Sequence, residues 1–317
     1  MDGPVRRRPG RVSEEEIVAE RKPEWLKKPL PRADSLNRME GVLRERALHT
    51  VCESALCPNL GECFQRGTAA FLILGDVCTR SCAFCGVTSG LPAGLDPAEP
   101  ANVADAVVAL GLEHVVVTSV TRDDLADGGA AHYAATITAI RHRAPGATIE
   151  VLIPDFLGRL DSLEVVLAEK PEVFNHNLET VSRLYATVRP QAEYQRSLNV
   201  LAYAASRRTG LVKTGCMVGL GETQEEVGAL LEDVRAAGVG VVTIGQYLRP
   251  SKHHLAVVEY VPPAVFDLYR ERGEALGLQV HAAPFVRSSF RAGESFAQAM
   301  RPRGGDLGSR QQAGHNV

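Results

Sequence analysis

The sequence predicts an α/β fold in which a parallel sheet is covered by helices, arranged as a partial (β/α)6 TIM-like barrel. Apolar strand-like segments alternate with amphipathic helix-like segments along most of the chain. The strand-like segments are apolar throughout, as expected for strands buried on both faces of a parallel sheet. No Gly-x-Gly-x-x-Gly follows the first of them, which argues against a dinucleotide-binding fold.

The alternation gives six strand and helix units, preceded by an amphipathic helix near 36–50. The strands are expected at 70–74, 114–120, 148–153, 173–176, 211–214 and 239–246. The helices are expected near 103–110, 131–143, 160–169, 181–188, 194–205, 222–236 and 264–276. Three parts follow: an N-terminal extension over 1–66, the barrel over 67–280, and a C-terminal segment over 281–317.

Both ends of the chain differ in composition from the barrel. Residues 1–20 are basic and then acidic without apolar periodicity, which predicts a solvated tail. The Pro-rich segment 22–31 cannot form a long helix, and the Gly- and Gln-rich end beyond Arg301 is predicted to be disordered.

Composition excludes several classes of function. The chain has 317 residues, 45% of them hydrophobic, enough for a sizeable core, and a net charge of −3. That charge gives no general attraction for nucleic acid. No apolar stretch approaches the length of a membrane span, so we expect a soluble, cytoplasmic protein.

Six of the seven cysteines fall into two groups of three with different spacing. The first triplet is Cys52, Cys57 and Cys63, and the second triplet is Cys78, Cys82 and Cys85. The remaining cysteine, Cys216, is expected to be a small core residue without a redox role.

Three kinds of site use cysteines in this number. Disulfides are typical of small secreted domains, which this long chain does not resemble. Structural zinc usually takes repeated Cys-x2-Cys pairs, but only Cys82 and Cys85 have that spacing, so His114 or His132 would have to be recruited. An iron–sulfur cluster fits better, because it is held by soft thiolates at short spacing. A triplet supplies three ligands for four irons, and the fourth iron is left open for another group.

Polar residues follow the second and fourth predicted strands, at the sheet edge where such barrels carry their chemistry. Thr118 ends the second strand, and Asn175, Asn177 and Glu179 follow or end the fourth. Their amides and carboxylate could bind a polar cofactor by directed hydrogen bonds. Alternatively, Asn175 and Glu179 cap a turn and a helix.

The second triplet, with Phe84 just before its last cysteine, resembles the signature of the radical S-adenosylmethionine (SAM) enzymes. In those enzymes SAM chelates the open iron through its amino and carboxylate groups. The first triplet, immediately upstream, resembles the auxiliary-cluster motif of the lipoyl synthase family. The ordered pair of triplets is specific for that family, and the resemblance extends from about Lys22 to Met300.

Arg287-Ser288-Ser289-Phe290 resembles the Arg-Ser-Ser-Tyr motif of the same family, whose serine is the fourth ligand of the auxiliary cluster. Adjacent residues on an extended segment point opposite ways, so one hydroxyl is expected to reach iron, and Ser289 is favoured over Ser288. Phe290 departs from the motif, which puts a hydrogen bond from a phenol in doubt but leaves the serine ligation.

The resemblance implies two [4Fe-4S] clusters and SAM as cofactors, with the cysteines of the second triplet and Ser289 as catalytic residues. The implied reaction inserts sulfur at C6 and C8 of an octanoyl chain in amide linkage to a lysine, with the auxiliary cluster as sulfur donor. Residues expected to contact SAM, in part from their place at strand ends, are Phe84, Thr118, Asn175, Asn177, Glu179 and Arg189.

The implied partners are octanoylated lipoyl-carrier domains, namely the glycine cleavage H protein and the E2 subunits of 2-oxoacid dehydrogenases. A flavodoxin- or ferredoxin-type electron donor and an iron–sulfur carrier for cluster repair are also implied. The cationic segment 246–254 contacts an acidic carrier or is a solvated rim. Two other functions stay open: a radical SAM sulfur-inserting enzyme acting on a small molecule, and a non-catalytic iron–sulfur carrier.

Overall fold

A computed structural model describes residues 22–28, 33–66 and 68–301. Its main sheet has eight strands in the order β1-β2-β5-β6-β7-β8-β9-β10. These strands are His49–Thr50 (β1), Ala70–Ile73 (β2), His114–Ser119 (β5), Thr148–Leu152 (β6), Val173–Asn175 (β7), Leu211–Val218 (β8), Val241–Gln246 (β9) and Gln279–Ala282 (β10). β1 is antiparallel to β2, and every other neighbouring pair is parallel. The order begins at β1 and ends at β10, so the sheet is open, as a partial barrel requires.

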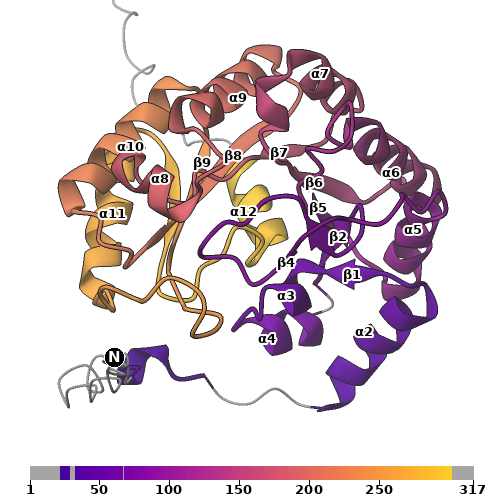
Figure 1. Ribbon diagram of the computed structural model, residues 1–317, viewed down its shortest axis with the longest axis horizontal. Helices are drawn as coiled ribbons and strands as arrows, with labels where there is room; N and C mark the ends of the chain where they lie inside the picture. Colours follow the sequence, from indigo (N-terminus) through magenta and orange to yellow (C-terminus); the bar gives the residue numbers. More distant parts are fainter. Residues whose placement is uncertain (1–21, 29–32, 67, 302–317) are drawn as a thin grey trace, which may run out of the picture.

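Helices cover the outside of this curved sheet (Figure 1). The outer helices are Glu99–Leu110 (α5), Ala130–Arg143 (α6), Leu160–Ala168 (α7), Tyr194–Arg207 (α9), Gln224–Ala236 (α10) and Pro263–Ala275 (α11). Each connects two successive parallel strands, as in repeated βαβ units. The prediction of alternating strands and helices around a parallel sheet is therefore confirmed.

The remaining elements lie before the barrel, in its loops or after it. They are Glu24–Leu26 (η1), Ala33–Glu45 (α2), Val51–Ser54 (α3), Leu60–Gln65 (α4), Val77–Cys78 (β3), Thr88–Ser89 (β4), Phe156–Gly158 (η2), Ser182–Leu184 (η3), Tyr185–Val188 (α8) and Ala292–Ala299 (α12). The predicted helix over 36–50 is thus placed too late, because the chain already forms the edge strand β1 at His49.

The sheet has one more parallel strand than predicted. β10 pairs with β9 in parallel register, with Gln279 opposite Val241. It was missed because the polar Gln279 and His281 alternate with Val280 and Ala282 along it, whereas a strand such as β2 is an apolar run. The predicted boundary between 280 and 281 therefore falls inside β10.

The core lies between the sheet and the outer helices and is continuous along the barrel. β2 is completely buried, and so are Val115, Val116 and Val117 in β5, which explains why these segments are apolar. Within the described residues, no helix combines the length and apolar character needed to cross a membrane. The tails predicted over 1–20 and beyond Arg301 lie outside the described residues.

Glycine shapes the turn that leads toward the second triplet. Leu74 and Gly75 end β2 with φ values of 70° and 91°, which turns the chain sharply after the strand. Gly129 begins α6 with φ 91°, and a Cβ there would lie 2.4 Å from Leu74 Cδ1. Only glycine allows the β5–α6 loop to approach Leu74 this closely.

Candidate active site

The first triplet lies on two short helices and the turn between them, just before β2. Cys52 is in α3, Cys63 is in α4, and Cys57 lies in the turn. Thr50 caps α3 by accepting a hydrogen bond from the Glu53 N–H at 3.3 Å. The Cys57 N–H donates to the Cys52 carbonyl at 2.9 Å. These local bonds hold the three cysteines in one compact segment.

The second triplet follows β2 directly, at the carboxyl end of the sheet. Cys78 ends β3, and Cys82 and Cys85 lie in the loop that leads to β4. The Cys85 N–H donates to the Cys82 carbonyl at 3.1 Å. The Ala83 N–H donates to the Val188 carbonyl at 3.0 Å, so the loop is also attached to α8.

All six of these cysteines line one cavity of about 500 Å³. It is within the size range of pockets that bind cofactors and small molecules. Seven of the other predicted site residues line it as well: Phe84, Thr118, Asn177, Glu179, Arg189, Ser288 and Ser289. The fold thus brings together the N-terminal extension, the strand ends and the C-terminal segment.

The thiols of both triplets are available as metal ligands. All seven cysteines are free. In the described part of the chain, no three His, Cys, Asp or Glu side chains form a group that would hold a metal ion. A zinc site gathers its ligands at about 2.0–2.3 Å from one ion. In an iron–sulfur cluster each thiolate binds its own iron.

Burial keeps most of these thiols protonated until a metal binds. Burial raises the pKa of Cys52 to about 12 and that of Cys63 to about 11, with the neighbouring Cys57 adding to both shifts. Burial likewise raises the pKa of Cys85 to about 12 and raises the pKa of Cys82. The thiols bind iron as thiolates, so cluster binding here must release protons.

Three polar residues that follow β7, Asn177, Glu179 and Arg189, form a polar wall of the cavity. Asn177 Nδ2 donates to Glu179 Oε1 at 3.0 Å, and Arg189 Nη1 donates to the Asn177 carbonyl at 2.9 Å. Burial raises the pKa of Glu179. Arg189 Nε is buried and has no hydrogen-bond partner among the described residues. Because an unpaired buried donor is costly, this atom marks a place for an acceptor from a ligand.

Glu179 itself has a backbone conformation that is uncommon for a non-glycine residue, with φ 68°. Its N–H donates to the Gly215 carbonyl at 3.0 Å, and its carbonyl accepts from the Met217 N–H at 2.8 Å. These two bonds to β8 hold the strained residue in place. Such residues concentrate at binding sites, and the N-cap of the next helix, η3, is Val181 and not Glu179.

Asn175 does not reach the cavity. Its side chain is buried, and its Nδ2 donates to Glu150 Oε1 at 3.0 Å. Glu150 also binds Lys213 Nζ at 2.9 Å, so Asn175 belongs to a buried polar cluster between β6, β7 and β8. The expectation that Asn175 contacts SAM is therefore not supported. Thr118 does line the cavity, although its hydroxyl donates to the Leu152 carbonyl at 2.9 Å.

The two serines of the C-terminal motif have different surroundings. They lie in a turn, in which the Phe290 N–H donates to the Arg287 carbonyl at 3.0 Å, and not on the extended segment that we predicted. Ser288 Oγ donates to Asn177 Oδ1 at 2.9 Å. The Ser289 hydroxyl makes no hydrogen bond within the described ranges and lines the cavity. Ser289 therefore has the hydroxyl that is available to a ligand.

The C-terminal segment is attached to the first triplet. Asn59 Nδ2 donates to the Phe285 carbonyl at 2.7 Å. Lys28, from the Pro-rich N-terminal segment, donates to Glu62 Oε2 at 2.9 Å and lies over the rings of Phe285 and Phe290 at 4.7 and 5.4 Å. An aromatic ring at position 290 can therefore bind a cation without a phenol. Sequence reasoning had given Lys28 and Asn59 no role.

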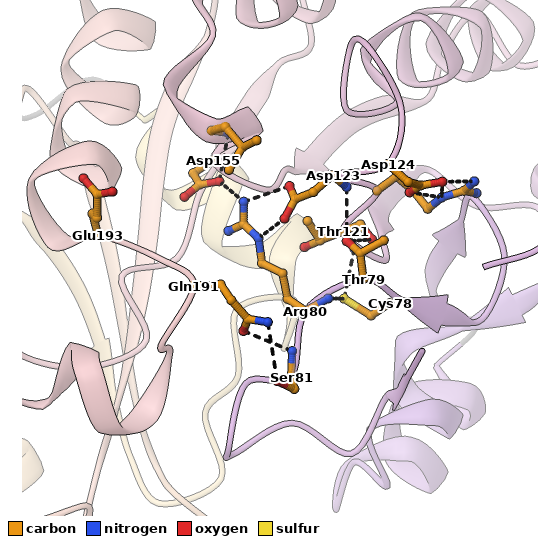
Figure 2. Close-up of polar contacts among 12 residues, drawn as sticks. Cys78, Thr79, Arg80, Ser81, Thr121, Asp123, Asp124, Asp155, Gln191 and Glu193 are labelled. Atoms are coloured by element: carbon orange, nitrogen blue, oxygen red, sulfur yellow. Dashed lines mark hydrogen bonds and ion pairs between the residues drawn. The ribbon is translucent and has the colours of Figure 1, made fainter. Parts of the chain in front are cut away.

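Sequence reasoning also missed a set of charges beside the second triplet. Arg80 lies between Cys78 and Cys82, is 4% exposed, and binds both Asp123 and Asp155 (Figure 2). Two features of the sequence could have indicated these charges. They are the cation Arg80 inside the cysteine motif and Asp155 just after the third predicted strand.

Comparisons with known proteins agree with this site. A model of the radical SAM superfamily matches residues 72–234. The lipoyl synthase of Thermus thermophilus is 52% identical over 288 residues, which cover 90% of this chain and 89% of that protein. The lipoyl synthase of Caldanaerobacter subterraneus is 54% identical over 274 residues, which cover 86% of this chain and 96% of that protein.

Solved structures resemble the fold at low sequence identity. SuiB of Streptococcus suis bound to S-adenosylmethionine has a TM-score of 0.52 and 12% identity, over 70% of this chain and 54% of that one. Methylornithine synthase has a TM-score of 0.51 and 12% identity, over 66% of this chain and 62% of that one. The fold is thus of the radical SAM type. Together with the sequence identities, it shows that the chain belongs to the lipoyl synthase family of the radical SAM superfamily.

Proposed function

We propose that this chain performs lipoyl synthesis, inserting sulfur at C6 and C8 of an octanoyl chain held in amide linkage to a lysine of a carrier domain. The observation that supports this most is that both cysteine triplets line one cavity. A substrate chain in that cavity is close to both sets of ligands at once. The C–H bonds at these carbons have no acidity that a general base could use, so side-chain acid–base chemistry cannot start the reaction.

The cofactors fit the residues that line the cavity. We assign Cys78, Cys82 and Cys85 to the [4Fe-4S] cluster that binds SAM, and the first triplet with Ser289 to a second [4Fe-4S] cluster. When bound, the clusters and SAM would supply the electron, the hydrogen-abstracting radical and the sulfur atoms. The thiol-rich donor set and the unbonded Ser289 hydroxyl support this assignment.

A serine oxygen is a suitable ligand for an iron that must leave the cluster. Oxygen is a harder ligand than a thiolate and holds iron of a sulfur cluster less firmly. A cluster held by the first triplet and Ser289 therefore has one iron that is easily released. This supports its role as the sulfur donor, which is consumed during turnover.

SAM would lie against the polar wall of the cavity. The Arg189 guanidinium, with its unpaired Nε, suits the carboxylate of SAM. Glu179 and Asn177 suit its amino group and ribose hydroxyls, which need acceptors and directed hydrogen bonds. Phe84 and Thr118 complete the lining on the side of the second triplet. The residues of this chain thus bind and orient SAM and keep water from it.

The carrier domain would approach along the loop after β9. Arg249 and Pro250 line the cavity, while Lys252 and His253 are exposed beside them. His254 Nε2 lies 2.9 Å from the Cys85 carbonyl oxygen, so the loop is adjacent to the second triplet. We infer that the carriers are octanoylated H protein and E2 subunits, that a flavodoxin- or ferredoxin-type protein donates electrons, that an iron–sulfur carrier repairs the cluster, and that the protein is cytoplasmic.

The test is an anaerobic reaction of the reconstituted protein with reductant, SAM and an octanoyl-lysine peptide, analysed by mass spectrometry. We expect a peptide carrying two added sulfur atoms, together with 5′-deoxyadenosine. The Cys82→Ala variant, which lacks one of the three cysteine ligands of the cluster that binds SAM, serves as the control and should form neither product. Deoxyadenosine without sulfur on the peptide would indicate a small-molecule substrate instead. A cluster spectrum that SAM does not perturb would indicate a non-catalytic iron–sulfur carrier.

A further inference from the structure

Arg80 is a buried cation in the middle of the second cysteine loop. Its Nε donates to Asp123 Oδ2 at 2.6 Å, and its Nη2 donates to Asp123 Oδ1 at 2.9 Å. The same Nη2 donates to Asp155 Oδ1 at 2.7 Å (Figure 2). Arg80 therefore connects the cysteine loop with the residues that follow β5 and β6, through a two-pronged contact that only a guanidinium can make.

The Asp155 end of this contact is fixed from several sides. Asp155 is completely buried and also accepts from Arg196 Nε at 2.8 Å and from the Leu157 N–H at 3.1 Å. Phe156 and Leu157 have positive φ values of 44° and 54°. Non-glycine residues in this conformation are strained and persist only where the surroundings hold them. The loop after β6 is thus built to present this carboxylate.

The Asp123 end is fixed by the threonine within the cysteine loop. Thr79 Oγ1 donates to the Thr121 carbonyl at 2.9 Å and accepts from the Asp123 N–H at 3.1 Å. The Thr79 N–H also donates to the Thr121 carbonyl at 3.0 Å. The cysteine loop is therefore attached to the β5–α6 loop from Cys78 to Arg80 (Figure 2).

These contacts aim two backbone donors at one ligand sulfur. Cys78 Sγ accepts from the Arg80 N–H at 3.4 Å and from the Thr121 N–H at 3.3 Å. One donor belongs to the residue that the two carboxylates hold, and the other to the segment that Thr79 holds. Hydrogen bonds to ligand sulfurs help to set the reduction potential of an iron–sulfur cluster, because they stabilise the more negative, reduced state.

We infer that Arg80 is a positioning residue. Its contact with Asp123 and Asp155 holds the second cysteine loop so that the Arg80 and Thr121 N–H groups point at Cys78 Sγ. These two N–H groups raise the reduction potential of the cluster bound by the second triplet. This inference rests on the proposed binding of a cluster by the second triplet. Stability alone does not account for the arrangement, because a buried ion pair is often no better than packed apolar side chains.

If Arg80 acted on the reduction potential only through its charge, its variants would behave differently. Two guanidinium groups and three carboxylates, those of Arg80, Arg196, Asp123, Asp155 and Glu193, form a network whose formal charge is −1. Arg80→Lys keeps this charge but cannot bind both carboxylates with a planar fork. Arg196→Gln removes a positive charge from the same network but keeps both carboxylates that Arg80 binds. The two variants therefore separate position from charge.

The experiment measures the reduction potential by EPR-monitored titration of the full chain in which the first triplet is replaced by alanine. Only a cluster on the second triplet then contributes to the signal. We expect Arg80→Lys to shift the potential to more negative values and to change the EPR signal that SAM produces. We expect Arg196→Gln to stay close to the parent protein. SAM cleavage should fall by up to about 10²-fold in Arg80→Lys, as for other small misplacements of reacting groups.

An unchanged potential in Arg80→Lys, or a larger shift in Arg196→Gln, would show that charge acts instead and would overturn the inference. If Arg80→Lys does not fold, Asp123→Ala is informative, because Asp123 is partly exposed, with 26% of its side chain accessible. Charge alone predicts a more positive potential for that variant, whereas a loosened loop predicts a more negative one. A parent protein that binds no cluster would refute the ligand assignment itself, which is a distinguishable result.

Discussion

Replacing Lys213 with methionine leaves a carboxylate buried inside the barrel without its cation. Lys213 Nζ lies 2.9 and 3.2 Å from the two oxygens of Glu150, and both side chains are at most 2% exposed. Burial alone would raise the pKa of Glu150, but Lys213 and His114 lower it from 4.5 to about 2. At about 1.4 kcal/mol per pKa unit, this shift corresponds to about 3 kcal/mol.

This estimate agrees with the cost of about 3–5 kcal/mol for breaking a buried ion pair. We therefore expect Lys213→Met to lower the free energy of unfolding by about 3 kcal/mol at pH 7. The folded-state pKa of Glu150 is depressed, so the stabilisation is present above the unfolded value of 4.5 and is lost as the pH falls toward about 2. The difference between variant and parent should shrink over that range.

Urea denaturation of the metal-free chain, followed by circular dichroism at several pH values, measures this difference. Arg272→Gln is a matched control, since its pair with Glu232 is exposed and should contribute at most about 1 kcal/mol. The double variant Lys213→Met/Glu150→Leu should recover part of the lost stability, because it removes the buried charge but leaves Asn175 Nδ2 without its acceptor. A loss below about 1 kcal/mol at pH 7, or a loss that does not change with pH, would refute the reasoning.

Three further predictions concern the cavity. Asn175→Ala should lower the free energy of unfolding by about 1.5–3 kcal/mol without changing SAM affinity. Asn177→Ala should weaken SAM binding measured by calorimetry. Equal effects of the two variants on SAM affinity would contradict the different placement of the two side chains. Ser289→Ala should reduce iron retention at the first triplet more than Ser288→Ala, and the reverse order of iron contents would reject the ligand assignment. Cys57→Ala should still cleave SAM but add no sulfur to the peptide, so a lipoyl product from it would exclude the first triplet as sulfur source.

Much of the barrel was predictable because its strands are buried on both faces. Largely apolar sequence marks such strands directly, and six of the seven parallel strands were found this way, although β6 and β8 carry the buried Glu150 and Lys213. β10 escaped because Gln279 and His281 interrupt the apolar pattern. The two triplets were found because cluster ligands are close together in sequence, and the cavity then unites loops that are far apart.

Partners that are distant in sequence were not predictable. Asn175 was assigned to the SAM site because it ends a strand, yet its side chain binds Glu150, on the neighbouring strand. Nothing local indicates that this carboxylate and Lys213, 63 positions apart, meet inside the barrel. The role of Arg80 likewise depends on aspartates that follow two other strands.

The central claim is that sulfur from the cluster on the first triplet enters the product. The most direct test builds the clusters with an isotopically heavy sulfide, removes free sulfide, and runs a single turnover with octanoyl-lysine peptide in the presence of unlabelled sulfide. The account predicts that both sulfur atoms of the lipoyl product carry the heavy isotope. A product that contains only unlabelled sulfur would contradict it.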